Sequence, residues 1–245
     1  MRVFDSIIIG TGEVGSAIYK IQKEQNKKVG SVDIADKDFQ KKLLEYKAET
    51  LHITFPYFNK KQFVNSFKAY IRNFEPSLVI IHSTVPVGTT DVLGKIFDDI
   101  FIVHSPVRGQ HPNLYESLKY FVKYIGTDDD MAYEIAKDEL KGMPVKRMKS
   151  AKTSELAKLL CTSYYGVCIS WHREMKKMCD KFGVDFGEAV TDLNKTYNKG
   201  YKKFRPNVIR PVLTPPEGKC GGHCVIPNKK LLSAQYKSEF LNLIK

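Results

Sequence analysis

The segment Gly10-Thr-Gly-Glu-Val-Gly15 decides the fold of this chain. The run Arg2–Ile9 before it ends in three isoleucines, as a strand covered on both faces does, and a helical pattern follows to about Gln25. Asp33 closes the next apolar run, 21 residues after Gly12 (33 − 12). A strand, a glycine loop, a helix and a later acidic residue together form the fingerprint of a dinucleotide-binding βαβ unit.

Each position of this loop has a predicted role. Gly10 permits a tight turn, Gly12 lets the backbone approach a pyrophosphate, and Gly15 lets the helix pack closely on the sheet. The helix N-terminus offers N–H groups to the phosphates. Asp33 would bind the adenosine ribose hydroxyls and repel a 2′-phosphate, which favours NAD over NADP. Glu13 adds a negative charge near the pyrophosphate, and a glycine turn without a ligand is the alternative interpretation.

Strands and helices are expected to alternate as far as residue 147. The pattern predicts further strands at 28–33, 50–53, 78–82, 100–104 and 122–125, and helices at 37–46, 60–73, 88–97 and 130–141. Such alternation indicates βαβ units and a mostly parallel sheet. We therefore expect an α/β Rossmann-type domain over residues 1–147.

The pattern changes after this domain. Residues 150–182 contain no proline, and their apolar residues recur at steps of three and four, which predicts one long helix. A helix at 185–197, a loop rich in Pro, Gly and basic residues at 198–222, and one or two helices at 229–244 follow. We expect an all-helical domain over 148–245, and a homodimer formed through the apolar stripe of the helix 150–182.

The composition predicts a cytoplasmic protein. Apolar runs such as Leu78–Ile81 are too short to cross a bilayer, and Asp5 interrupts the N-terminal run, which argues against a signal peptide. Five cysteines, an odd number, argue against a disulfide framework. The net charge of +12 favours anionic partners, but the lysines are scattered and no nucleic-acid motif occurs. We expect a small anionic substrate, no specific nucleic acid and no membrane.

The segment Gly218-Lys-Cys-Gly-Gly-His-Cys224-Val-Ile-Pro227 is the second informative stretch. A cysteine flanked by glycines before a helix N-terminus has the backbone access and the electrostatic setting of a nucleophile. A buried structural cysteine is one alternative. Zinc binding by Cys220, His223 and Cys224 is another, although no partner pair occurs at zinc-finger spacing. We expect no metal.

Four segments, in this order, resemble the UDP-glucose/GDP-mannose dehydrogenase family. They are Gly10–Gly15 with Asp33, Ser83-Thr-Val-Pro-Val-Gly88, Glu155-Leu-Ala-Lys158 and Gly221-Gly222-His-Cys224. The last three are much more specific than the first, which many Rossmann proteins share. The chain ends about twenty residues after the cysteine loop, so a truncated member without most of the family's third, nucleotide-binding domain is expected.

The resemblance implies an NAD-dependent oxidation of a primary alcohol on a nucleotide sugar, with two hydride transfers. It implies that Cys224 is the nucleophile, that Lys158 stabilises the oxyanion, and that Thr84 places a water or the cofactor. It also places Phe55 and Pro56 along the nicotinamide half of NAD. The complete set of expected cofactor-binding residues is Gly10, Gly12, Glu13, Val14, Gly15, Asp33, Phe55, Pro56 and Thr84.

Three polar partners differ from the family pattern. Val107 replaces a glutamate that takes part in proton transfer and thioester hydrolysis, Thr162 replaces an asparagine, and Asn228 replaces an aspartate. Thr162 and Asn228 are nevertheless candidate catalytic residues, with Cys224, Lys158 and Thr84. The alternatives are a single-step alcohol dehydrogenase or reductase for a different small anionic substrate, and an NAD-binding protein without turnover.

A substrate site is expected on two basic segments. His104, Arg108, His111 and Asn113 lie where the family has its acidic segment, and Arg108 and His111 are the predicted ligands of an anionic group there. An ordinary polar surface loop is the alternative. The remaining expected substrate-binding residues are Arg205, Arg210, Gly221 and Gly222.

Overall fold

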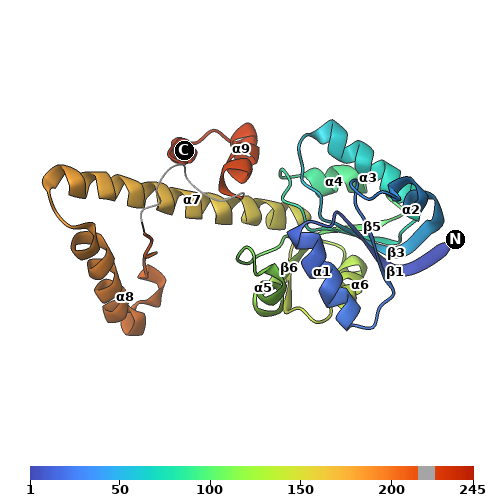
Figure 1. Ribbon diagram of the computed structural model, residues 1–245, viewed down its shortest axis with the longest axis horizontal. Helices are drawn as coiled ribbons and strands as arrows, with labels where there is room; N and C mark the ends of the chain where they lie inside the picture. The colour runs from blue at the N-terminus through green and yellow to red at the C-terminus, as the bar shows by residue number, and fades with distance from the viewer. Residues whose placement is uncertain (215–223) are drawn as a thin grey trace. The chain divides into compact units, whose positions relative to one another are not determined.

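The computed structural model describes residues 1–214 and 224–245. They form two compact units, Met1–Lys158 and Leu159–Lys245. The first unit contains a seven-stranded sheet in the order β2-β1-β3-β4-β5-β6-β7 (Figure 1). Its strands are β1 (Arg2–Ile9), β2 (Val29–Val32), β3 (Tyr46–Ile53), β4 (Leu78–Ile81), β5 (Phe101–His104), β6 (Lys123–Gly126) and β7 (Val145–Met148).

The sheet is mostly parallel, as the sequence predicts. The strands β1 to β5 pair in parallel, β6 runs antiparallel to β5 through the pair His104 and Gly126, and β7 runs parallel to β6. The strand order reverses at β1, which has β2 on one side and β3 on the other. This reversal is where an open α/β sheet places its ligands.

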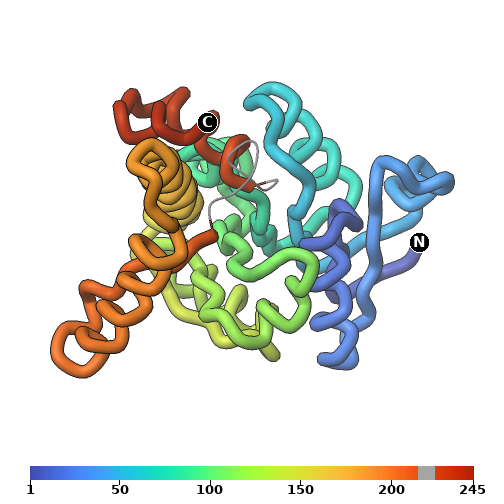
Figure 2. The backbone as a smooth tube through the Cα atoms, turned by 60° about the vertical axis from the view of Figure 1, so that its left-hand side comes forward, coloured from blue at the N-terminus to red at the C-terminus, as the bar shows by residue number. Residues whose placement is uncertain are grey.

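Alternate residues of the central strands enter two separate hydrophobic cores. Ile8 and Ile80 face one core, whereas Ile7 and Ile81 face the other. The first core is covered by α1 (Glu13–Glu24), α5 (Leu114–Tyr120) and α6 (Asp130–Glu139). The second is covered by α2 (Phe39–Glu45), α3 (Lys60–Phe74) and α4 (Thr89–Gly94). Figures 1 and 2 show the two helical layers on opposite faces of the sheet.

Two elements of this unit were not predicted. The helix α5 has seven residues and buries only Leu114, Ser117 and Leu118, so its apolar periodicity is too short to detect. The strand β7 lies at the edge of the sheet and carries Lys146 and Arg147, which hide the apolar alternation of a strand.

The second unit is helical, as predicted. It contains most of α7 (Ala151–Phe182), the π-helical turn η1 (Gly187–Asp192), α8 (Leu193–Phe204), the 3-10 turn η2 (Pro206–Val208), α9 (Val225–Gln235) and α10 (Glu239–Asn242). The sequence places the domain boundary at 147, where the sheet ends, and the first compact unit also includes the first eight residues of α7.

The predicted loop 198–222 is wrong at its start, because α8 continues to Phe204. Arg205 then adopts φ −145° and ψ 68°, outside the helical region, as expected for a residue before a proline. The helix therefore ends just before Arg205 and Pro206, and not at the change in composition. Across the described residues, none of the helices is both long enough and apolar enough to cross a membrane.

Candidate functional site

The glycine loop is fastened to the end of β3 at the reversal of strand order. Gly10 follows β1 and Thr54 follows β3. The Thr54 hydroxyl lies 2.9 Å from the carbonyl oxygen of Ile9 and 2.8 Å from that of Gly10, and both oxygens can accept from it. The glycine loop and the end of β3 are thus in direct contact at the point where the strand order reverses.

The three glycines of the loop meet different constraints. Gly10 has φ +97°, a conformation that favours glycine. A Cβ at Gly15 would lie 1.9 Å from the Gly10 carbonyl oxygen, so only glycine fits there. A Cβ at Gly12 would meet no atom within 4 Å, and Gly12 immediately precedes α1. The open space therefore lies at a helix N-terminus, while Val14 is half-buried against the core beneath it.

Asp33, the residue after β2, accepts three hydrogen bonds. Thr11 donates its N–H (2.7 Å) and its hydroxyl (3.0 Å) to Oδ2, and Ala35 donates its N–H (3.0 Å) to Oδ1. These donors, assisted by the charge of Lys42, hold the pKa of Asp33 below its usual value. An ionised carboxylate has about four acceptor positions, so Oδ1 retains capacity for one more donor.

Glu13 is engaged by a histidine from a distant segment. Its Oε2 contacts Nδ1 of His111, and the side chains are 37% and 46% exposed respectively. His111 lies beyond β5, so this contact joins the segment after β5 to the glycine loop. The Glu13 carboxylate therefore has a partner of its own near the open space at Gly12.

The predicted nicotinamide-side residues lie at the ends of β3 and β4. The Phe55 ring packs against Phe63, with 5.1 Å between centroids, and the Phe55 carbonyl accepts the Ser83 hydroxyl at 2.6 Å. Thr84 is half-buried and Pro56 is exposed. The structure thus brings the segments after β3 and β4 together at the edge of the sheet where the glycine loop lies.

The start of α7 is attached to the segment after β4 through Glu155. Its carboxylate accepts the N–H of Gly88 (2.6 Å), the N–H of Thr90 (2.8 Å) and the hydroxyl of Thr90 (2.7 Å). Burial raises the pKa of Glu155, although these donors oppose the rise. Two of the motifs that carried the family resemblance are therefore in direct contact.

Two lysines hold three successive carbonyl groups in the segment after β5. The Lys158 ammonium donates to the carbonyl of Val107 at 2.8 Å, and Lys123 reaches the carbonyls of Ser105 (2.6 Å) and Pro106 (3.4 Å). Lys123 is 2% exposed, and burial together with the charge of Lys158 holds its pKa well below the usual value. The Val107 side chain is buried in the core, so this residue offers Lys158 a carbonyl and not a side chain.

His104 is a core residue and not part of a surface substrate loop. It is fully buried, with Nδ1 2.7 Å from the Ser154 hydroxyl and Nε2 3.2 Å from the Ser83 carbonyl. The carbonyl can only accept, so Nε2 carries the proton and Nδ1 accepts from Ser154. Burial, reinforced by the charges of Lys123 and Lys158, lowers the pKa of His104 to about 3.

Arg108 is exposed beside two aromatic rings. Its guanidinium carbon lies 5.6 Å from the ring centroid of Phe121 and 5.8 Å from that of Tyr124. Both distances are within the range of cation–π attraction. With His111, Arg108 remains on the segment that the sequence predicts for an anionic group, whereas His104 does not.

In the second unit, the predicted residues Asn228 and Thr162 contact each other. The Asn228 amide donates to the Thr162 hydroxyl at 3.2 Å, and the Asn228 N–H donates to the Cys224 carbonyl at 3.2 Å. Cys224 immediately precedes α9. Gly221 and Gly222, like Cys220 and His223 of the zinc alternative, lie outside the described residues.

Arg210 and Arg205 lie near the end of α8. The Arg210 guanidinium carbon is 3.6 Å from the centroid of the Tyr197 ring, and its backbone exchanges two hydrogen bonds of 2.8 Å with the Asn198 side chain. Arg205 is exposed. Arg210 is thus held in one orientation by α8.

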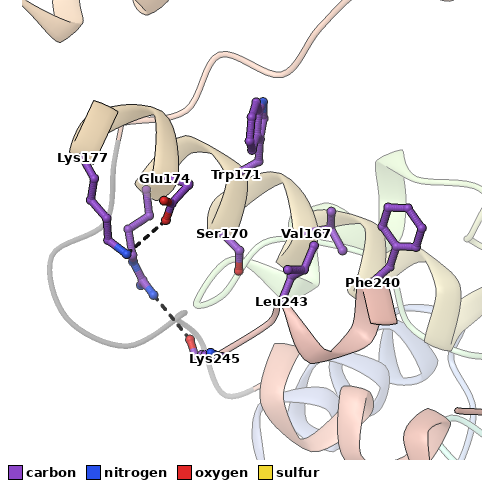
Figure 3. A pocket seen from close by; sticks show the side chains of 9 residues that line it. Val167, Ser170, Trp171, Glu174, Lys177, Phe240, Leu243 and Lys245 are labelled. Carbon is purple, nitrogen blue, oxygen red and sulfur yellow. Dashed lines mark hydrogen bonds and ion pairs between the residues drawn. The ribbon is translucent and has the colours of Figure 1, made fainter. Parts of the chain in front are cut away.

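A cavity of about 580 Å³ opens along α7 in the second unit (Figure 3). It contains none of the predicted site residues. Its lining residues come from α7 and the C-terminal segment, and they are Val167, Ser170, Trp171, Arg173, Glu174, Lys177, Phe240, Leu243 and Lys245.

Several buried polar residues of the first unit were not singled out from the sequence, and four of these are ionisable and lie outside the quoted motifs. They are His52, His82, Lys123 and Glu139, all buried. The sequence did contain a signal for the two histidines. His52 stands between the apolar residues Leu51 and Ile53, and His82 directly follows the apolar run 78–81. A polar residue inside a strand buried on both faces needs a polar partner. Among the described residues, no group of His, Cys, Asp and Glu is arranged to hold a metal ion.

No protein-family model matches the chain. It is 32% identical over 174 residues to the UDP-N-acetyl-D-mannosamine dehydrogenase of Methanocaldococcus jannaschii, a match that spans 69% of this chain and 37% of the relative. The UDP-D-ManNAc dehydrogenase of Pyrococcus horikoshii superposes with a TM-score of 0.78 at 20% identity, covering 98% of this chain and 66% of the other. The 3-hydroxyisobutyrate dehydrogenase of Mycobacterium tuberculosis gives 0.73 at 14%, covering 98% and 91%.

These comparisons confirm the resemblance to nucleotide-sugar dehydrogenases that the motifs indicated. The chain spans little more than a third of the length of the Methanocaldococcus relative. The structural matches, both below 25% identity, confirm the fold: a Rossmann-type sheet followed by helices.

The neutral state of His104 predicts a loss of stability in acid. Its folded pKa of about 3 lies below the ordinary 6.5, so the unfolded chain binds a proton between these values and the native chain does not. This contribution is fully present above pH 6.5 and decreases as pH falls towards 3, by up to about 1.4 kcal/mol per pH unit. From pH 7.5 to pH 5, the free energy of unfolding measured in urea should fall by about 2 kcal/mol less in His104→Gln than in the wild type.

The core change Ile80→Val, which removes no ionisable group, is the control and should keep the wild-type pH dependence. An unchanged dependence in His104→Gln would contradict the neutral, buried state of His104.

Proposed function

We propose that this chain binds NAD and oxidises an alcohol group of a nucleotide sugar or a related anionic substrate. The observation that carries the proposal is the glycine loop at the reversal of strand order, with an ionised Asp33 beside it. The sequence match to a UDP-N-acetyl-D-mannosamine dehydrogenase supports the same class of substrate.

The residues around the loop fit a dinucleotide. The open space at Gly12 suits a pyrophosphate, because it lies at the N-terminus of α1, where backbone N–H groups lack partners within the helix. The remaining acceptor position on Asp33 suits a ribose hydroxyl and not a phosphate. The Glu13 carboxylate, which would oppose phosphate binding at this site, is engaged by the His111 side chain. When bound, NAD would accept a hydride from the alcohol carbon of the substrate.

Lys158 is the proposed electrostatic group of the reaction. A lysine ammonium has three donors, and the Val107 carbonyl takes one of them at 2.8 Å. That bond fixes the direction of the ammonium, which suits it to stabilise negative charge developing on the substrate oxygen as the alcohol loses its proton. Thr84, Phe55 and Pro56 are the proposed neighbours of the nicotinamide.

Cys224 is the proposed nucleophile for an aldehyde intermediate. Its thiolate would add to the aldehyde carbon, and the oxygen would take up a proton. The resulting thiohemiacetal would then give a hydride to a second NAD and lose its hydroxyl proton, which leaves a thioester. Asn228 and Thr162 are the proposed polar partners of this step, and their mutual hydrogen bond supports their belonging to one site. Arg108, His111, Arg205 and Arg210 are the proposed contacts of the anionic part of the substrate, with Gly221 and Gly222.

One observation favours a second candidate, a single oxidation or the reverse reduction of a small anionic substrate. Thioester hydrolysis needs a base to activate water, and at position 107 the chain has a buried valine whose carbonyl faces Lys158. The chain also covers 91% of a 3-hydroxyisobutyrate dehydrogenase, a protein named for a small hydroxy acid. Lys158 alone would serve such a reaction, without Cys224.

We also propose a homodimer formed through α7. Within the second unit, six large apolar residues of α7 are between 43% and 73% exposed, and five of them share one face of the helix: Leu160, Tyr164, Trp171, Met178 and Phe182. At about 100° per residue, these five lie within an arc of about 40° on the helix surface. A narrow exposed apolar stripe of this kind is typical of a helix that packs against another helix.

The cofactor assignment predicts a specific loss of affinity in Gly12→Ala. The added methyl group would occupy the open space and should weaken NADH binding by about tenfold or more, about 1.4 kcal/mol, without unfolding the protein. Gly94→Ala, which also has no atom within 4 Å of the new methyl group, is the matched control in a fluorescence titration. NADPH should bind more weakly than NADH, because of Asp33; equal NADH affinity in both variants would contradict the site.

The catalytic assignment predicts NADH formation from NAD and at least one member of a panel of UDP- and GDP-sugars. Two NADH per sugar, abolished in Cys224→Ala and retained in the exposed-cysteine control Cys161→Ala, is the expected result. One NADH per substrate that survives Cys224→Ala and disappears in Lys158→Met would support the second candidate. If NADH binds but no sugar reacts, the nucleotide-sugar assignment is wrong.

The dimer assignment predicts different effects of the same change at neighbouring tyrosines. Tyr164→Glu places a charge within the apolar stripe and should shift the protein to monomer in analytical ultracentrifugation. Tyr165→Glu alters a residue that is also exposed but lies about 100° away on the helix, and it should leave the dimer intact. A monomeric wild type, or equal effects of both changes, would refute the interface.

A further inference from the structure

A chain of buried polar groups crosses the ends of three strands in the first unit. Glu139 of α6 contacts His52 of β3, with 2.8 Å between Oε1 and Nε2. His52 contacts His82, just after β4, with 2.9 Å between Nδ1 and Nε2. Nδ1 of His82 lies 2.9 Å from the carbonyl oxygen of Ser105, just after β5. His52 is fully buried, and His82 and Glu139 are 3% and 8% exposed.

The direction of this chain follows from counting hydrogens. The Ser105 carbonyl can only accept, so Nδ1 of His82 carries a hydrogen. A neutral imidazole has one N–H, so Nε2 of His82 is an acceptor and Nδ1 of His52 must donate to it. If Glu139 is ionised, Nε2 of His52 must donate as well. His52 then carries a hydrogen on both nitrogens and is positively charged.

The surroundings of Glu139 favour its ionised form. The Lys27 ammonium lies 2.6 Å from Oε2 of Glu139, and its side chain is 21% exposed. Burial opposes ionisation of Glu139, but the hydrogen bonds and charges of His52 and Lys27 hold its pKa below the usual value. Burial and the charges of Lys123 and His52 hold the pKa of His82 well below the usual value, which keeps His82 neutral.

The far end of the chain reaches the proposed active site. The Ser105 carbonyl accepts from both His82 and Lys123, at 2.9 and 2.6 Å. Two residues further on, the Val107 carbonyl binds Lys158 at 2.8 Å. The segments that follow β3, β4 and β5 also carry Phe55, Thr84 and Val107, respectively, close to these buried groups in sequence.

We propose that His52 is a buried imidazolium and that the chain Glu139–His52–His82 is a positioning device, which fixes the Ser105 carbonyl and through it the Val107 carbonyl that orients Lys158. Only the link to Lys158 as a reacting group rests on the proposed function. The charge on His52 and the placement of both carbonyls do not, so they are testable on the protein without substrate.

The charge is tested by long-range ¹H–¹⁵N correlation spectra of the imidazole rings at pH 7.5, in which single substitutions assign His52 and His82. We expect His52 to be doubly protonated and His82 to be neutral with its hydrogen on Nδ1. In Glu139→Gln the amide can donate to Nε2 of His52, so His52 should become neutral while His82 is unchanged. Glu134→Gln, an exposed change on the same helix, should alter neither ring. A neutral His52 in the wild type, or His82 protonated on Nε2, would overturn the proposal.

The positioning role is tested at the Val107 carbonyl. Val107 is the only valine that precedes an arginine, so a sample with ¹³C-carbonyl valine and ¹⁵N-arginine isolates its signal. His82→Leu removes the donor to Ser105 and should shift this signal, whereas His82→Asn keeps an N–H near the place of Nδ1 and should return it towards the wild-type position. A general destabilisation would lower the free energy of unfolding of both variants, but it would not shift the Val107 signal in His82→Leu and restore it in His82→Asn. The same signal in all three proteins would refute the positioning role.

Discussion

The close approach of the glycine loop to the end of β3 is the contact on which the rest of the first unit depends. A Cβ at Gly15 would lie 1.9 Å from the Gly10 carbonyl oxygen, and the same oxygen is within reach of the Thr54 hydroxyl. The start of α1, the turn after β1 and the start of the segment after β3 are therefore fixed together. This contact leaves the N–H groups at the N-terminus of α1 facing an open space, with Asp33 held beside it by Thr11.

From this point, polar contacts connect one strand end to the next across the sheet. Ser83 after β4 donates to the Phe55 carbonyl after β3, and Glu155 of α7 accepts from Gly88 and Thr90. Inside the core, the buried hydrogen bonds from Glu139 through His52 and His82 to Ser105 connect the ends of β3, β4 and β5 in the same way. Buried polar groups of this kind are costly when unpaired, and their mutual pairing selects one arrangement of the segments that bear the candidate site.

The sequence predicts most of the fold because periodicity and glycine spacing are local signals. The strand at Arg2–Ile9 and the long helix ending at Phe182 appear where the pattern places them. The helix α5 and the strand β7 are short and owe their existence to neighbours, so local pattern does not reveal them. His104 shows the same limit within the site: its sequence position suggests a surface loop, but its partners Ser154 and Ser83, distant in sequence, place it in the core.

The segment after β5 determines which chemistry the residues of the first unit can support. A carboxylate at position 107 would give Lys158 a counter-charge and give the reaction a base, whereas a peptide carbonyl accepts a hydrogen bond but not a proton at neutral pH. A carbonyl acceptor, unlike a carboxylate, brings no negative charge to Lys158, whose ammonium would stabilise a developing oxyanion in the proposed hydride transfer. Activation of water for a second step requires a base from elsewhere. For the proposed reaction, the contacts at Val107 therefore favour a first oxidation over the hydrolysis that would complete a second.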